Sequence, residues 1–304
     1  MTAADTDLRP RISPVTIRPS LGRRVRDRGA TIAIYTAVFV ALAPLVAVLW
    51  AVVSKGMDRL DLDFLTYSMR GLGAQDIGGG AYHAIVGTAQ QVGLASLMSV
   101  PLGVLVAIYL VEYGRNSQLA RTVSFVVDVM TGIPSIVAGL FVLAFWVLAL
   151  GRGFSGFAGA IALALLMLPV VVRSSEEMFR LVPDDLREAA LALGVPRWLV
   201  ICRVVVPTAA AGLVTGLMLA VARVTGETAP LLLTVFFTDS INVDPFHGPQ
   251  IGLAQYVFDQ AIRPSDAAVT RAWAGALTLM VGVILLNVAA RLLARWKAPK
   301  VHQH

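Results

Sequence analysis

The sequence is 304 residues long, 57% hydrophobic and only 14% charged, with a mean hydropathy of +0.75. Soluble domains carry about a quarter charged residues, so this composition excludes a soluble globular chain and is typical of a membrane protein. The net charge of +6 comes from Lys and Arg beside apolar runs, without a basic stripe interleaved with aromatics, so nucleic acid is not an expected partner. The single cysteine, Cys202, excludes an intramolecular disulfide.

Six apolar segments are long enough to cross a hydrocarbon core, which takes about 20 helical residues. In chain order they are approximately 31–53, 84–111, 122–150, 154–172, 208–237 and 273–293. The first follows a polar, basic stretch and is too long for a signal-peptide core, so we expect a membrane anchor there. The sequence therefore predicts an all-α membrane protein with six transmembrane helices.

The distribution of Lys and Arg predicts the orientation of these helices. Eighteen lie in the N-terminal arm, the even-numbered loops and the C-terminus, against six on the other side. Both termini are therefore expected in the cytoplasm, and the loops 54–83 and 238–272 outside. The predicted organisation is a basic cytoplasmic arm (1–30), a transmembrane domain (31–297) and a cytoplasmic tail (298–304).

The third segment contains "TGIP", which should break its helix because Pro134 lacks an N–H group. A new half-helix beginning near Ser135 could present backbone donors to an anion, although a plain kink is the simpler interpretation. Asp128, one to two turns earlier, has no partner that the sequence identifies.

Arg173 ends the fourth segment after an uncharged run. It is either a positive-inside anchor or a residue of a transport pathway. The neighbouring pair Glu176 and Glu177 is interpreted as a solvated helix face.

The fifth segment carries Arg223 and, four residues later, Glu227. A charge inside a membrane is costly, so Arg223 should face a partner or a wet cavity. On a continuous helix Glu227 would share its face and could neutralise it. The pair either fixes helix packing or forms a site in which an anion competes with Glu227 for the planar guanidinium.

A cytoplasmic loop interrupts the apolar pattern between the fourth and fifth segments, within 174–207. Pro183 and the acidic residues after it are typical of a helix start, and Gly194 of a stop. A second short helix is expected from Pro196 to Pro207. One face of the first helix is narrow and apolar, formed by Leu186, Ala189, Ala190 and Leu193. The helix either lies on the membrane or docks a soluble partner.

This loop resembles the EAA loop of the permeases of ABC importers. Glu188-Ala189-Ala190 is followed after three residues by Gly194 and after nine more by Val204-x-Val206-Pro207, with valines where isoleucine and leucine are usual. The resemblance implies the type I importer architecture. It also implies that Glu188, Ala189, Ala190 and Gly194 couple to a separate ATPase subunit.

Four further segments, in family order, resemble phosphate-specific permeases of the PstA type. They are "GGGAYHAIVGT" (78–88), "TGIPSIVAGLF" (131–141), "LPVVVRSSEEMFRLVP" (168–183) and "ARVTGETAPLLLT" (222–234). The resemblance implies a phosphate importer of the bacterial plasma membrane, with Arg173, Arg223 and Glu227 implicated in transport. The implied partners are a second permease, an ATPase dimer, an extracytoplasmic phosphate-binding protein and membrane lipid.

The chain is not expected to be its own ATPase or any other enzyme. No lysine follows a glycine as a P-loop requires, and no catalytic triad or zinc-ligand cluster occurs in the sequence. ATP and magnesium are therefore expected on the partner, with no cofactor on this chain. The alternatives are an EAA-loop permease for sulfate, molybdate or an amino acid, and a secondary transporter, which the EAA spacing disfavours.

Overall fold

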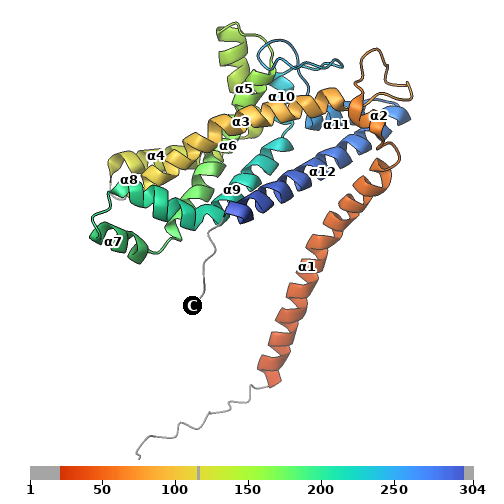
Figure 1. The fold of residues 1–304 in the computed structure, drawn as a ribbon. Helices are drawn as coiled ribbons and strands as arrows, with labels where there is room; N and C mark the ends of the chain where they lie inside the picture. Colours follow the sequence, from red (N-terminus) through yellow and green to blue (C-terminus); the bar gives the residue numbers. More distant parts are fainter. Residues whose placement is uncertain (1–20, 115–116, 298–304) are drawn as a thin grey trace, which may run out of the picture. The chain divides into compact units, whose positions relative to one another are not determined.

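The structure is a computed structural model that describes residues 21–114 and 117–297 (Figure 1). Every regular element in these ranges is helical. The first half of the predicted basic arm (1–20) and the predicted tail (298–304) lie outside the described residues.

The chain divides into two compact units after Trp50. The first contains most of α1, Leu21–Gly56, whose described side chains are all exposed as far as Trp50. An apolar helix that its own unit leaves uncovered is suited to a lipid environment.

The second unit holds the remaining helices. The long ones are α3 (Tyr82–Ile108) with the π-helical turn η1 (Tyr109–Tyr113), α4 (Gln118–Thr131), α5 (Ser135–Val142) with η2 (Leu143–Ala149), α6 (Gly156–Arg180), α8 (Arg197–Val200) with η3 (Ile201–Val205) and α9 (Val206–Thr225), and α12 (Asp266–Lys297). The short ones are α2 (Leu62–Thr66), α7 (Asp184–Ala192), α10 (Ala229–Thr234) and α11 (Leu253–Ile262).

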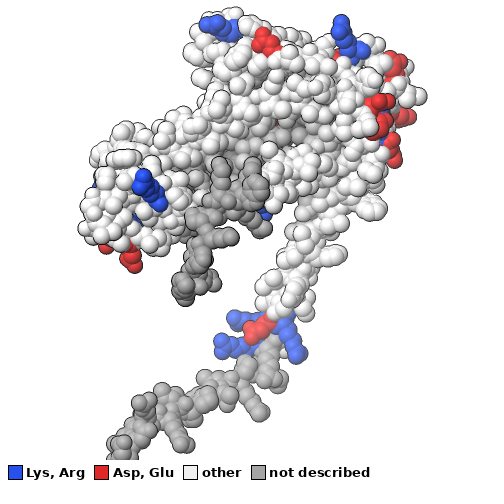
Figure 2. Space-filling model, in the orientation of Figure 1, with Lys and Arg blue, Asp and Glu red and all other residues white. Residues whose placement is uncertain are grey.

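Five helices of the described chain are long and apolar enough to span a membrane, and α4 with α5 makes a sixth, bent span. On the face in Figure 2, charged side chains gather at the ends of the helices and leave the surface between them uncharged. The predicted all-α fold is confirmed, and the described chain has five or six candidate spans where the sequence predicts six.

The third span is broken rather than kinked. α4 and α5 meet at 103°, across residues 132–134. Pro134 has an extended ψ of 138° and caps the start of α5. The break is held open by packing, because Gly139 of α5 lies directly against the backbone of Pro230 in α10.

The fifth span differs from its prediction at both ends. Pro207 does not end the preceding helix: η3 and α9 run continuously through it. The π-type bond from Val206 N–H to Ile201 C=O fits this position, because Pro207 cannot donate an α-helical bond of its own. The helix then ends at Thr225, and the expected continuation to 237 is the separate α10.

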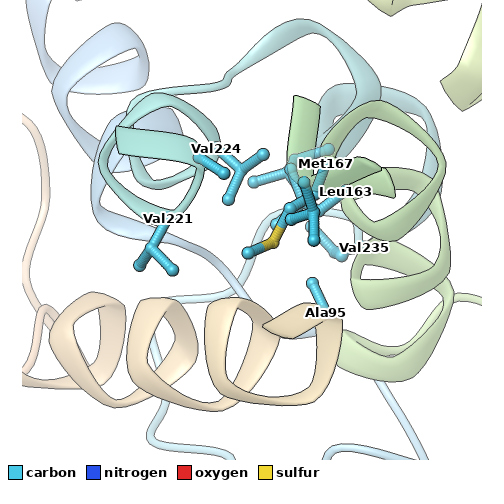
Figure 3. Packing of buried hydrophobic residues seen from close by; sticks show 9 residues of the cluster. Ala95, Leu163, Met167, Val221, Val224 and Val235 are labelled. Carbon is cyan, nitrogen blue, oxygen red and sulfur yellow. The ribbon is translucent and has the colours of Figure 1, made fainter. Parts of the chain in front are cut away.

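The core forms where α3, α6 and α9 meet. Figure 3 shows Ala95 of α3 facing Leu163 and Met167 of α6, with Val221 and Val224 of α9 beside them. More than half of the most apolar stretch of α6 is buried, which makes this helix the centre of the unit. Side chains on α6 are therefore held in place by their neighbours.

The loop before α3 is fastened by Arg271 of α12, whose residue surface is 1% exposed. Its guanidinium donates to the carbonyls of Ala74 (2.9 Å) and Asp76 (2.6 Å) and to Oε1 of Gln260 (2.8 Å). These bonds order residues 74–78 against α11 and α12.

Candidate functional site

Arg173 joins α6 to α4. Its Nη1 lies 2.5 Å from Oε2 of Glu176, and its Nη2 lies 2.5 Å from Oδ1 of Asp128. Nη2 also donates to the carbonyl (2.9 Å) and the hydroxyl (2.8 Å) of Ser124. Arg173 is therefore more than an anchor at the membrane surface: it ties two spanning segments together.

The acidic partners of Arg173 differ from the sequence prediction. Asp128, which had no assigned partner, pairs with Arg173. Glu176 is not part of a solvated face, because its side chain is 6% exposed and also accepts from Arg180 at 2.5 Å. Glu177 is exposed, as predicted.

Arg223 and Glu227 do not form the expected pair. α9 ends at Thr225, and Gly226 caps it, so Glu227 lies beyond the helix. The i,i+4 relation holds only on a continuous helix. Among the described residues, no ion pair joins these two side chains; Arg223 is exposed and Glu227 half-buried.

The structure places Arg173 and Arg223 at different depths. A β-carbon at Gly216 of α9 would meet the side chain of Ser174 on α6. Gly216 and Ser174, the neighbour of Arg173, therefore lie at the same height along the two helices. Arg223 lies seven residues further along α9, which is about 10 Å at the helical rise. The two candidate pathway arginines are therefore successive positions along the bundle rather than one clamp.

Ser135 is the first residue of α5, directly after the break, and is half-buried. A helix start inside a spanning segment directs unpaired backbone N–H groups along its axis. The predicted role of Ser135 in binding an anion stays a prediction.

The helix α7 carries three of the four residues expected to couple to an ATPase, and the fourth, Gly194, follows its end. Its start at Asp184 after Pro183 and its stop before Gly194, whose φ is +78°, follow the sequence prediction. Glu188 and Ala189 are exposed, and Ala190 is half-buried. A β-carbon at Gly194 would be strained, because that φ favours glycine.

The buried side chain of α7 is Arg187, which the sequence did not single out. It is 7% exposed and lies 3.0 Å from Oε1 of Glu112 in η1 through its Nε. Nη1 donates to the carbonyl of Val182 (2.6 Å) and to Asp184 (2.9 Å), and Nη2 to the carbonyl of Phe179 (2.7 Å). Arg187 thus fastens α7 to the end of α6 and to η1.

Apolar side chains of the same loop point outward. Leu186, Leu193 and Trp198 are 44%, 84% and 61% exposed. A short helix that buries an arginine and exposes leucines has its apolar surface free for another molecule. The sequence left two interpretations open, a helix lying on the membrane and a helix docking a soluble partner. The exposed apolar face agrees with both.

The loop between α10 and α11 carries perturbed carboxylates. Burial raises the pKa of Asp239 above its ordinary value, opposed by the nearby Arg263. A hydrogen bond from His247, 2.8 Å away, holds the pKa of Asp244 below its ordinary value. Within the described residues, no group of three or more His, Cys, Asp and Glu side chains could hold a metal ion.

An all-helical chain with five or six candidate spans, arginines within them and an exposed amphipathic loop helix is typical of a multi-pass membrane transport component. Residues 99–302 match the profile of the family described as "Binding-protein-dependent transport system inner membrane component". The chain belongs to this family of inner membrane components, which contribute a permease subunit rather than a catalytic one.

Several relatives cover nearly the whole chain. Phosphate transport system permease protein PstA 1 of Mycobacterium tuberculosis (strain CDC 1551 / Oshkosh) is 47% identical over 93% of this chain and 93% of its own. PstA of Mycobacterium leprae is 45% identical over 95% and 96%, and PstA of Pasteurella multocida 38% over 89% and 95%. The resemblance to PstA-type permeases is confirmed.

Solved structures share the fold. A chain of the inward-facing MetNI methionine ABC transporter matches with a TM-score of 0.57 and 22% identity, over 71% of this chain and 94% of that chain. A chain of a bacterial alginate ABC transporter in complex with its alginate-bound periplasmic protein matches at 0.60 and 12% identity, over 93% and 98%. The architecture is that of ABC transporter permeases.

Proposed function

We propose that this chain is the PstA-type permease subunit of an ATP-driven phosphate importer. It forms half of the translocation path beside a second, related permease. Two ATPase subunits carry the ATP and magnesium, and an extracytoplasmic phosphate-binding protein delivers the anion. The names of relatives that are 38–47% identical support phosphate as the substrate.

The coupling role rests on how α7 is attached to the permease and on what it exposes. Its one buried side chain, Arg187, fixes it to the body of the permease, while its leucines are exposed. A partner that grips the exposed face moves α6 and η1 with it, because Arg187 bonds to both. The charge distribution of the sequence supports a cytoplasmic position for α7, where an ATPase would reach it.

In the transport path the anion meets two arginines in turn. Arg223, exposed near the end of α9, is the first on the outer side when α7 faces the cytoplasm. Arg173 lies about 10 Å further in, along the helix axis. A planar guanidinium binds phosphate oxygens through two parallel hydrogen bonds, which gives each position both charge and geometry.

Glu188→Lys is expected to reduce the amount of ATPase subunit that co-purifies with the chain, without preventing its insertion. Glu188 is exposed on α7, so the substitution changes the docking surface and no buried contact. The measurement is subunit stoichiometry after affinity purification, together with phosphate-stimulated ATPase activity. Glu177→Lys reverses an exposed charge on α6 outside the loop and should leave both unchanged. Wild-type stoichiometry in Glu188→Lys would refute docking at this face.

Arg223→Lys is expected to lower phosphate uptake into proteoliposomes by about tenfold or more, because lysine keeps the charge and loses the bidentate fork. Assembly and basal ATPase activity should survive, since Arg223 is exposed. Exchanging the charges (Arg223→Glu with Glu227→Arg) should not restore uptake, because the two side chains are unpaired in this structure. Full uptake by Arg223→Ala would remove Arg223 from the path.

A further inference from the structure

The two carboxylates on Arg173 differ in their surroundings. The side chain of Glu176 is 6% exposed and is shared with Arg180, whereas that of Asp128 is 66% exposed. In the described part of the chain, Asp128 forms an ion pair with Arg173 alone. One carboxylate is therefore built into the interior and the other lies on an accessible edge of the guanidinium.

On the water-filled path of the proposed function, Asp128, whose side chain is 66% exposed on this chain, is reached by water. An ion pair that water reaches adds little to stability, because both groups are solvated when they separate. A buried carboxylate that loses its partner is strongly destabilising. Asp128 can therefore leave Arg173 at small cost, while Glu176 stays.

The edge that Asp128 occupies suits an oxyanion. Its Oδ1 lies 2.5 Å from Nη2 of Arg173, and the arginine side chain is itself 28% exposed. Carboxylate and phosphate oxygens match the same guanidinium geometry. The hydroxyl of Ser124, 2.8 Å from the same Nη2, would remain beside an incoming anion.

Charge balance supports an exchange of anions at this edge. Arg173 and Arg180 are matched by Glu176 and Asp128. When an anion replaces Asp128, the guanidinium remains neutralised, and the displaced Asp128 carboxylate keeps its charge on the exposed side of α4. An unpaired arginine inside the bundle is avoided both with and without substrate.

We propose that Asp128 is a displaceable counter-ion of Arg173, which yields this edge of the guanidinium to phosphate during transport. The inference rests on the proposed function, in which Arg173 lies on the phosphate path. Displacement also removes the ion pair between α4 and α6, so anion occupancy is linked to the helix that leads into the break at 132–134. Asp128 is thus a residue that controls access to Arg173 rather than a ligand of phosphate.

Asp128→Asn is expected to tighten the binding of inorganic phosphate to the whole detergent-solubilised complex without its binding protein. If Asp128 occupies this edge of the guanidinium nine-tenths of the time, only about a tenth of the complexes can bind phosphate there. Removing its charge then raises the phosphate affinity about tenfold. The measurement is equilibrium dialysis with radiolabelled phosphate, with ADP and magnesium present to fill the nucleotide sites. Sulfate, measured in parallel, should gain similarly because Asp128 competes with any tetrahedral oxyanion.

Two control variants isolate the contact. Glu177→Gln removes the same charge from an exposed residue of α6 and should leave phosphate affinity at the wild-type value. Adding Arg173→Gln to Asp128→Asn should abolish the gain in phosphate affinity, because the guanidinium that binds the anion is lost. Asp128→Ser provides a second variant should asparagine hinder assembly, which size-exclusion chromatography and basal ATPase activity report.

Phosphate affinity in Asp128→Asn and Asp128→Ser that equals or falls below wild type would overturn the displacement proposal. So would a gain that persists in the Arg173→Gln background. Failure of the proposed function has a different result: Arg173→Gln would then show wild-type phosphate uptake in proteoliposomes. The two failures are therefore distinguishable.

Discussion

Gly87→Ala is expected to lower the thermal stability of the purified protein markedly. A β-carbon at Gly87 on α3 would lie 2.0 Å from the carbonyl oxygen of Ile251 and 3.0 Å from its carbonyl carbon. These are backbone atoms and cannot rotate away, and the neighbouring Leu253 N–H is held by the hydroxyl of Thr88 at 2.6 Å. Overpacking of this kind costs about 1–3 kcal/mol, and more where the neighbour is rigid. Thermal unfolding in detergent measures the loss.

Gly93→Ala is the matched control. It lies on the same helix, and among the described residues a β-carbon there meets no atom within 4 Å besides the nearby backbone of its own helix. An alanine in a helix interior is about 1 kcal/mol more favourable than glycine, so Gly93→Ala should not lower the unfolding temperature. Equal unfolding temperatures for Gly87→Ala and the wild type would show that α3 and residues 250–252 do not pack as closely as described.

The parts of the fold that the sequence predicts are those with local causes. Hydropathy over about 20 residues locates a spanning segment wherever it packs. α7 was bounded correctly because Pro183 and Gly194 act on their immediate neighbours. The passage of the helix through Pro207 was missed, because a change to π-type bonding compensates for the proline and leaves no mark in composition.

The break of the third span shows where local reasoning ends. The "TGIP" motif located the interruption at Pro134, but the plain kink that was the simpler interpretation is wrong: the helices meet at 103°, and Gly139 of α5 packs against α10. The pairing of Arg223 with Glu227 likewise presumed a continuous helix through both residues. The helix instead ends at Thr225, although the helix-weakening Gly226 and Pro230 are visible in the sequence.

The ion pairs that join different helices of the candidate site could not be predicted from spacing. Arg173 and Asp128 are 45 residues apart, and Arg187 and Glu112 are 75 residues apart. Only the packing of α4 on α6, and of α7 beside η1, brings them together. Spacing does indicate the local pairs. Glu176 follows Arg173 by three residues and precedes Arg180 by four, and Asp184 precedes Arg187 by three. None of these spacings reveals that Glu176 and Arg187 are buried.

Arg187→Ala is expected to destabilise the protein by about 3–5 kcal/mol, because it leaves a nearly buried carboxylate without its partner. Glu112 is 12% exposed, and the carbonyls of Phe179 and Val182 lose their donors in the same change. Thermal unfolding reports the stability. Phosphate transported per ATP hydrolysed, in proteoliposomes with the whole complex, should fall as well, because α7 is no longer fastened to α6 and η1.

Adding Glu112→Gln to Arg187→Ala separates these two effects. Removing the unpaired charge should recover part of the stability, since an amide is far less costly to bury than an unpartnered carboxylate. It should not recover transport per ATP, because the glutamine restores no bond between α7 and η1. Arg187→Lys should lie between wild type and Arg187→Ala in both measurements, because one ammonium cannot reach Glu112 and both carbonyls at once. If the double variant regains stability and coupling together, α7 transmits motion without Arg187, and the coupling role belongs to the exposed face alone.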